Sequence, residues 1–448
     1  MEILKKQYTN LIIYLGLIAI LPAINKYFDT HVLKSFHFID ICIFLFFFFF
    51  LINRKRLKKY YSYENVILVS FFIFLRISLI TSIGGNHHKA FYELAIFFCM
   101  VLLFLFFQSK SFIENRKIII KTFLLIFFTF SLFETILGIE QFIFQKKIGY
   151  FFEPNFGFDI KGSASVYMSD SSMRLFKFMN IKSNYLIRSH GSFNHPNIYA
   201  GFLVVSLFLN LYMIFKSKKK LFFSSLMLLS FISLIFTFSR AALGSFILVS
   251  FIYFILMQKN KYDVKKSLFI FSILILLVSL IFFKQLSQRG FFSKIFQTKE
   301  SIQADKGSQN TREVLKNISK KMIRKKPILG IGLRNFIIKR EDYSNLKKID
   351  RANVHNIYLL IASEGGIASL LLFMMFLSYF IYNVSLNKIN SLEVSLFCVV
   401  VSFLIIGILD HYPISTYFGR LTMFSSLGIL NIKFKKHLSY SQRVYLYQ

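Results

Sequence analysis

The sequence has few of the residues and motifs that support redox, ATP or metal chemistry. Cys42, Cys99 and Cys398 each lie inside an apolar run, so we expect neither a disulfide framework nor a CxxC metal site. Walker A (GxxxxGK[ST]), HExxH and paired-aspartate motifs do not occur either. These absences exclude ATP-driven transport by this chain, and the sequence predicts no metal and no other cofactor.

Acidic residues are scarce, with 21 Asp and Glu against 55 Lys and Arg, for a net charge of +34. A surplus of this size would suit a nucleic-acid-binding protein. Many of the cations, however, sit in short clusters between apolar runs, as at 54–59 and 216–220. This placement is typical of charges that orient membrane helices, so we predict no nucleic-acid partner.

Apolar residues make up 55% of the 448 residues and lie in long runs. A helix needs roughly 20 apolar residues to cross a bilayer, and this length predicts an all-α polytopic membrane protein, a single integral membrane domain over 1–448 with about twelve spans. The predicted spans are 8–24, 36–52, 66–83, 90–107, 118–138, 197–215, 221–238, 241–257, 267–283, 356–383, 391–409 and 412–430.

Lys and Arg concentrate in the loops on one side of these spans, which predicts cytoplasmic N- and C-termini. Two long loops, 139–196 and 284–355, then fall on the outer side of the membrane. Loops longer than about 15 residues are more often functional than not. We therefore expect the chemistry at the outer face.

Polar residues gather in four stretches near the outer ends of spans. The first runs from Arg188 to Leu203 and contains Asn194 and Asn197, which could cap the helix that begins near Pro196 or bind substrate. The second, Phe238 to Phe246, holds Arg240, a single charge that either snorkels to the interface or faces substrate.

The third stretch, Asn310 to Phe336, predicts an amphipathic helix that ends before Pro327 and rests on the membrane surface. Asn310 and Glu313 resemble a capping box, which would place Arg312 in the first helical turn beside unpaired amides, a good anion site. The alternative is a basic interfacial helix that binds acidic headgroups. The apolar stripe of this helix comprises Val314, Leu315, Ile318, Met322 and Ile323.

The fourth stretch, Asn353 to Phe373, places His355 and Asn356 at the outer boundary of a span and Glu364 before a Gly pair inside it. An acid followed by two glycines in an apolar run predicts a helix break or close packing. A boundary histidine is often only interfacial, but this one shares its membrane face with Arg188, Arg240 and Arg312. Elsewhere, Arg76 and Glu93 within the third and fourth spans suggest a structural ion pair.

Arginine and histidine above a bundle of lipid-embedded helices suit a substrate with a diphosphate and a long hydrocarbon tail. Guanidinium groups match phosphate oxygens in geometry and charge. Histidine has an unperturbed pKa of ~6.5, which suits removal of a proton from a hydroxyl near neutral pH. The residues therefore point to chemistry on a lipid diphosphate carrier.

The four stretches, in this order and spacing, resemble the O-antigen ligase and O-antigen polymerase superfamily, which joins glycans carried on undecaprenyl diphosphate at the outer face of the cytoplasmic membrane. The resemblance implies a metal-independent, inverting glycosyltransferase with a C-type glycosyltransferase-like fold. It assigns diphosphate binding to Arg188 and Arg312, and the base to His355 in the His-Asn-x-Tyr-Leu motif. Arg240 matches the Ser-Arg motif, and we expect Arg240, Asn194, Asn197, Asn356 and Glu364 to bind substrate.

These residues do not show which molecule accepts the glycan. A polymerase extends another carrier-linked repeat unit, whereas a ligase uses lipid A core, and the long 139–196 loop favours the polymerase. A chain-length regulator is a further possible partner. A lipid-glycan flippase is the alternative from another class, but the repeated halves typical of transporters are not evident.

Overall fold

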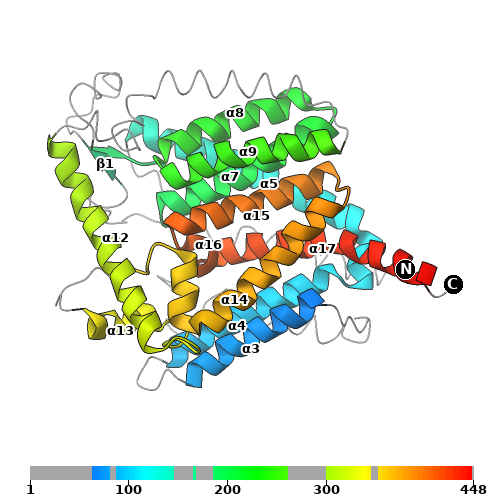
Figure 1. Cartoon of the computed structure of the whole chain (residues 1–448). Helices are drawn as coiled ribbons and strands as arrows, with labels where there is room; N and C mark the ends of the chain where they lie inside the picture. Colours follow the sequence, from blue (N-terminus) through cyan, green and yellow to red (C-terminus); the bar gives the residue numbers. More distant parts are fainter. Residues whose placement is uncertain are drawn as a thin grey trace. The chain divides into compact units, whose positions relative to one another are not determined.

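The computed structural model describes residues 63–80, 87–145, 165–167, 185–260, 299–344 and 352–445. These residues are mostly helical, and two short strands, β1 (Ser165–Tyr167) and β2 (Tyr185–Ile187), pair antiparallel. Figure 1 shows the elements along the chain. The helices are α3 (Tyr63–Ile80), α4 (His87–Phe107), α5 (Lys110–Phe144), α7 (Pro196–Lys216), α8 (Lys220–Phe236), α9 (Arg240–Lys259), α12 (Lys299–Lys325), α13 (Asn335–Lys339), the 3-10 helix η3 (Arg340–Tyr343), α14 (Ile357–Leu386), α15 (Ser391–Leu409), α16 (Tyr412–Ser415) and α17 (Tyr417–Tyr445).

Five helices in the described part of the chain are long and apolar enough to cross a membrane. They comprise most of α5 together with α7, α9, α14 and α15. The prediction of a mostly helical, polytopic membrane protein is thereby confirmed. The count of twelve spans stays a prediction, because the expected spans 8–24, 36–52 and 267–283 lie outside the described residues.

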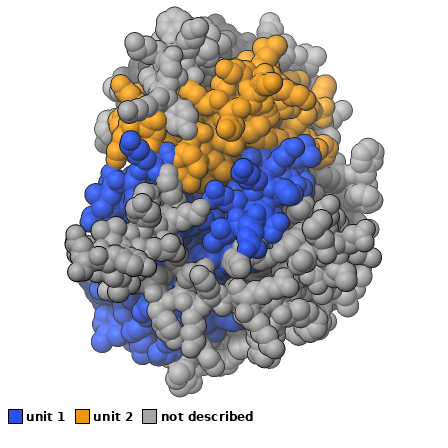
Figure 2. All heavy atoms as spheres, turned by 90° about the vertical axis from the view of Figure 1, so that its right-hand side faces the viewer, with its two compact units in different colours: residues 1–126, 311–389, 403–448 blue, residues 127–310, 390–402 orange. Residues whose placement is uncertain are grey.

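The chain divides into two units, coloured in Figure 2. Unit 1 comprises residues 1–126, 311–389 and 403–448, and unit 2 comprises 127–310 and 390–402. Within unit 1, α14 packs along α3 and α17 packs along α4. Within unit 2, α7 packs against α8 and α9.

Small polar side chains connect the helices of unit 2. The Ser131 and Ser206 hydroxyl oxygens lie 2.6 Å apart, and the Tyr199 and Ser233 hydroxyl oxygens lie 2.8 Å apart. All four residues are buried. In lipid, the burial of apolar surface contributes little to the free energy of helix association. Hydrogen bonds of this kind and close packing therefore help to hold the helices together.

A break in α14 provides a docking place for the segment that follows α12. Gly366 has φ 79° and ψ 171°, and this non-helical residue interrupts the hydrogen-bond pattern of α14. Backbone groups of the loop after α12 supply the hydrogen bonds that the helix lacks at this break. The Ile331 amide donates to the Ser363 carbonyl (2.9 Å), and the Ile367 amide donates to the Pro327 carbonyl (2.7 Å). The break predicted at the glycine pair is confirmed, and it joins the third and fourth polar stretches.

Replacing Gly366 by alanine is expected to release this loop. A Cβ atom at residue 366 would come within 1.9 Å of the Ile328 carbonyl oxygen, and an L-residue is strained at this φ. Strain of this kind costs about 1–3 kcal/mol. The thermal melting temperature of the purified Gly366→Ala protein should therefore fall. Gly244→Ala is the matched control, because nothing lies within 4 Å of its Cβ position, and an unchanged melting temperature in both variants would contradict the prediction.

Helix α12 differs from the prediction in where it begins and in what its apolar stripe contacts. It starts at Lys299, so Asn310 and Arg312 lie in the helix interior, and both the capping box and the first-turn anion site are wrong. The preceding residues are largely good helix formers, which allows the helix to extend upstream. Its end before Pro327 is confirmed.

The apolar stripe of α12 is buried against its own unit. Leu315, Ile318 and Met322 are at most 2% exposed, and they form a cluster with Phe336 and Leu360. The stripe is therefore not available to lipid, contrary to the predicted helix resting by this face on the membrane. Burial of the stripe fixes the orientation of α12 in unit 1, including that of the partly exposed Arg312.

Candidate active site

Two histidines and an aspartate meet at one end of unit 1. His355 precedes α14, while Asp410 and His411 connect α15 to α16. His355 Nδ1 lies 3.4 Å from Asp410 Oδ1, and the two imidazole centroids are 5.3 Å apart. Asp410 is buried, whereas a quarter of the His355 side chain is exposed. An aspartate that holds one ring nitrogen leaves the other for proton transfer with a bound molecule.

Asn356 fixes the position of its neighbour His355. Its Oδ1 accepts the Leu359 amide (2.8 Å) and caps α14, while its Nδ2 donates to the Ile408 carbonyl (3.0 Å). The cap satisfies a backbone amide that would otherwise have no partner in the helix. Asn356, predicted to bind substrate, thus connects the start of α14 to the end of α15 in this structure.

The charges around His411 show which other groups share this region. Burial and the positive charges of His355, Arg334 and Arg312 together lower the pKa of His411 to about 4, against the opposing effect of Asp410. Arg312 and His355, which the sequence predicted to act together, are therefore both close enough to His411 to affect its protonation.

The lowered pKa predicts a pH dependence of stability. Between pH 6.5 and about 4, His411 takes up a proton in the unfolded chain but not in the folded protein, so stability falls as the pH decreases through this window. The slope is at most about 1.4 kcal/mol per pH unit. Melting temperatures measured from pH 7 to pH 4 should fall less steeply for His411→Gln than for the native protein. Equal slopes would argue against a buried neutral imidazole.

The same three side chains could hold a metal ion by geometry alone. One ligand atom from each of His355, Asp410 and His411 lies within 4.8 Å of the others. Two imidazoles and a carboxylate suit divalent transition metals. The nearby positive charge of Arg312 opposes a bound cation, and therefore favours an anionic substrate group in this region.

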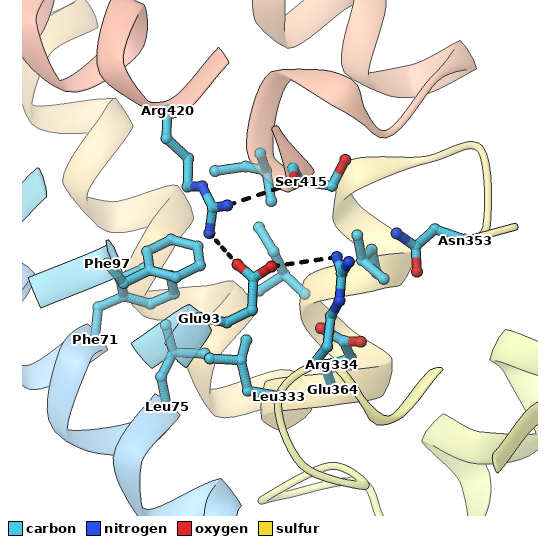
Figure 3. Close-up of a pocket in the computed structure, with 13 residues that line it drawn as sticks. Phe71, Leu75, Glu93, Phe97, Leu333, Arg334, Asn353, Glu364, Ser415 and Arg420 are labelled. Atoms are coloured by element: carbon cyan, nitrogen blue, oxygen red, sulfur yellow. Dashed lines mark hydrogen bonds and ion pairs between the residues drawn. The ribbon is translucent and has the colours of Figure 1, made fainter. Parts of the chain in front are cut away.

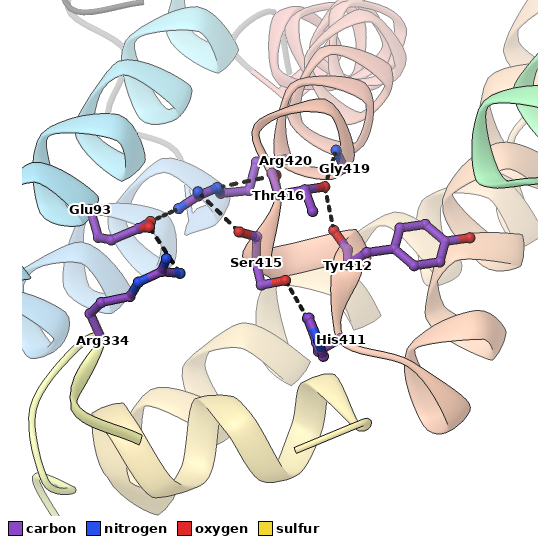
Figure 4. A network of polar contacts seen from close by, with 8 residues as sticks. All are labelled: Glu93, Arg334, His411, Tyr412, Ser415, Thr416, Gly419 and Arg420. Carbon is purple, nitrogen blue, oxygen red and sulfur yellow. Dashed lines mark hydrogen bonds and ion pairs between the residues drawn. The ribbon is translucent and has the colours of Figure 1, made fainter. Parts of the chain in front are cut away.

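Glu93 on α4 bridges two arginines beside this region (Figure 4). Its Oε2 lies 2.6 Å from Arg420 Nη1, and its Oε1 lies 3.3 Å from Arg334 Nη1. Arg420 is buried and lies over the Phe97 ring, whereas Arg334 is 37% exposed. The predicted partner Arg76 has no described side chain, and the described partners of Glu93 come from distant parts of the sequence.

Glu364 supports the loop that carries Arg334. The buried Glu364 carboxylate accepts the Phe336 amide at 3.2 Å, and the Glu364 carbonyl accepts the Gly332 amide at 3.0 Å. Arg334 itself has φ 64°, a left-handed conformation that side chains other than glycine rarely adopt. Glu364, predicted to bind substrate, therefore holds a strained loop in place, and strain of this kind is common at functional sites.

In unit 2, Arg188 is buried and held in a fixed orientation. Its Nε donates to the Thr237 carbonyl and its Nη2 donates to Asn197 Oδ1, both at 2.6 Å. The turn after it is bound to α5, where Gln141 Oε1 accepts the Gly191 amide (2.8 Å) and Glu134 Oε2 accepts the Ser192 amide (2.9 Å). Asn197 therefore orients Arg188 in this structure.

The other predicted residues of unit 2 are at its surface. Asn194 is exposed, and the side-chain cap of α7 comes from His195, whose Nδ1 accepts the Asn197 amide at 3.1 Å. The predicted capping by Asn194 or Asn197 is therefore wrong, because His195 immediately precedes Pro196 at the first helical position. Arg240 is exposed at the first residue of α9.

Residues 225–374 match the family model of the O-antigen ligases. This match supports a relationship of the chain to the O-antigen ligase superfamily. The matched segment contains Arg240, Arg312, His355 and Glu364, which the resemblance had singled out. No curated protein matches the chain.

The structure gathers one part of the predicted site. His355, Asn356, Arg312 and Glu364 belong to unit 1, whereas the remaining predicted residues belong to unit 2: Arg188, Asn194, Asn197 and Arg240. That the two groups act on one substrate stays a prediction.

Sequence reasoning missed several polar residues of unit 1. Asp410 and His411 were assigned to a short loop, and Arg334 and Arg420 were given no role. One signal was available, since Asp-His-Tyr-Pro is a polar run between two strongly apolar segments. For Arg420, buried against Glu93 from 327 positions away, the signal was a charge inside the predicted span 412–430.

Proposed function

We propose that the chain transfers a glycan from a polyprenyl diphosphate carrier, undecaprenyl diphosphate in bacteria, to the hydroxyl of an acceptor sugar. The match of residues 225–374 to the O-antigen ligase family model supports ligase or polymerase activity in general. The observation that supports the finer statement is the His355–Asp410 contact near the charge of Arg312. A base and an anion-binding group close together are what this reaction requires.

In the proposed mechanism, His355 takes the proton from the acceptor hydroxyl while Asp410 orients the imidazole. The acceptor oxygen attacks the anomeric carbon, and the bond from that carbon to the diphosphate oxygen breaks with inversion. Arg312 and Arg188 stabilise the charge that accumulates on the leaving diphosphate. Guanidinium groups supply this stabilisation themselves, so the proposed reaction needs no metal.

We further propose that the enzyme is a polymerase of repeat units, with the site at the outer face of the cytoplasmic membrane and both termini in the cytoplasm. The long segment 139–196, rich in Ser, Asn and aromatic residues, suits a sugar-binding groove and supports this choice over a ligase acting on lipid A core. A chain-length regulator is the partner that a polymerase would need.

Reconstitution in liposomes tests the proposal. Purified protein is supplied with labelled polyprenyl-diphosphate-linked oligosaccharide, with and without lipid A core, in the presence of EDTA. A polymerase produces longer glycans and free polyprenyl diphosphate without lipid A core, whereas a ligase requires that acceptor. Movement of the label across the bilayer without any new glycosidic bond would identify a flippase and overturn the proposal.

A further inference from the structure

We propose that the pocket around Glu93 in unit 1 binds a sugar ring of the acceptor glycan. This inference rests on the proposed function, because it assigns the sugar to the acceptor glycan of the proposed reaction. The pocket lies among α3, α4, α14 and α16 and the loop that carries Arg334 (Figure 3). Its empty space, counted together with the open solvent at its mouth, is about 450 Å³.

The charges that line the pocket favour a sugar over a diphosphate. Arg334 and Arg420 contribute two positive charges, Glu93 forms an ion pair with each of them, and Glu364 adds a second acidic side chain. A diphosphate carries several negative charges and would face two acidic groups here. Sugar hydroxyls both donate and accept hydrogen bonds, so they match a site in which guanidinium donors alternate with carboxylate acceptors.

A buried amide in the pocket also fits a hydroxyl ligand. Asn353 is only 6% exposed, and its Oδ1 has no hydrogen-bond partner among the described residues. Buried polar atoms are nearly always paired, and those that are not often mark a place for a bound molecule. A hydroxyl group would satisfy this oxygen, whereas a phosphate oxygen, which only accepts, would not.

The opposite wall of the pocket is apolar. Phe71, Leu75, Phe97 and Leu333 are among its lining residues, and the Arg420 guanidinium covers the Phe97 ring. Most small-molecule sites combine such an apolar wall with a few placed polar groups. The C–H face of a pyranose is apolar and its edge carries hydroxyls, so one ring can meet both surfaces.

The pocket is connected to the proposed base through two side chains. Ser415 lines the pocket, and its Oγ lies 2.6 Å from His411 Nδ1. The His411 ring is in turn 5.3 Å from that of His355. Ser415 and His411 therefore separate the pocket from His355. We assign the sugar in the pocket to a unit of the acceptor glycan next to the one whose hydroxyl His355 deprotonates.

A single tryptophan provides the readout of binding, because the native chain has none. Phe97→Trp places an indole in the pocket wall, and the fluorescence of the purified full-length protein is titrated with methyl glycosides. The panel covers neutral hexoses, deoxyhexoses, N-acetylhexosamines and uronic acids, with inorganic pyrophosphate and farnesyl diphosphate in parallel. We expect a saturable change with at least one glycoside and none with pyrophosphate. Saturation by the diphosphates alone, or by no compound, overturns the proposal.

Variants on the Phe97→Trp background distinguish a sugar from an anion as the ligand, because removing a negative charge changes the binding affinity of the two in opposite directions. Glu93→Gln should weaken glycoside binding at least tenfold, whereas it would strengthen the binding of an anion by removing a negative charge. Arg334→Gln should weaken it by a similar factor, and Arg324→Gln, an exposed arginine on α12, should have no effect. Asn353→Ala has no internal hydrogen bond from Oδ1 to lose, so it tests the pocket without disturbing the ion pairs.

Failure of this inference is distinguishable from failure of the proposed function. His355→Ala should abolish glycan transfer and leave glycoside binding to the pocket unchanged. If Arg334→Gln and Asn353→Ala bind glycosides like the native pocket, the pocket assignment is wrong while the transferase assignment stands. If His355→Ala transfers glycan normally, the transferase assignment is wrong whatever the pocket binds.

Discussion

His355→Ala is expected to lower the rate of glycan transfer by about 10²–10⁴-fold, the usual contribution of a positioned general base. His355 is the partly exposed imidazole of the cluster, and Asp410 lies 3.4 Å from its Nδ1. Without the ring, the acceptor hydroxyl loses the group that we propose takes its proton. The measurement is the initial rate of product formation in proteoliposomes that contain equal amounts of variant and native protein.

Asp410→Asn serves as the companion variant because it keeps the shape of the side chain and removes its charge. We expect a fall of about tenfold or more in the maximal rate, with a smaller effect on KM, since a wrongly oriented imidazole is a poorer base. His195→Asn is the control, because asparagine also caps helices and α7 should remain intact. A native rate in His355→Ala would exclude the proposed base.

Arg312→Ala is expected to reduce transfer by about 10²–10³-fold, the loss typical of one group that stabilises transition-state charge. Arg312 lies on the part of α12 that the buried stripe holds in unit 1, and its positive charge helps to lower the pKa of His411. Arg312→Lys should restore only part of the rate, since an ammonium group cannot bind two phosphate oxygens in the forked geometry of a guanidinium. The rate at saturating donor separates this effect from weaker donor binding.

Arg324→Ala is the matched control for Arg312→Ala, because both arginines lie on α12 and Arg324 is exposed. The same experiment on Arg188 uses Arg188→Lys, because Arg188 is buried and its removal would also leave the Thr237 carbonyl and Asn197 without their donor. Equal rates for Arg312→Ala and Arg324→Ala would show that Arg312 acts only as one of many surface cations.

The features that the sequence predicted well are those set by local patterns. Apolar run lengths located the helices, Pro327 marked the end of α12, and the Glu364-Gly-Gly triplet marked the break in α14. The start of α12 was predicted too late because a capping pattern occurs inside a segment that continues as helix. Local patterns of this kind report propensity, which tertiary context overrides.

The site was less predictable, because contacts between distant residues define it. His355 was found through its motif, but its partner Asp410 is 55 positions away, and Glu93 meets Arg334 and Arg420 from other helices. Nothing in a single sequence records which charged side chains will be neighbours after folding. The charges were therefore visible in the sequence, whereas their pairing was not.

The docking of the segment 327–332 onto the interrupted helix is made by main-chain atoms on both sides. Side chains take no part in those hydrogen bonds, so substitutions at the exposed residues of the segment should leave them intact, whereas the glycines with positive φ and the buried Ile331 are constrained. Chains with quite different residues between the proline and the last glycine could therefore share this architecture. Such an attachment tolerates sequence drift while it keeps the neighbouring guanidinium, that of Arg334, at a constant place.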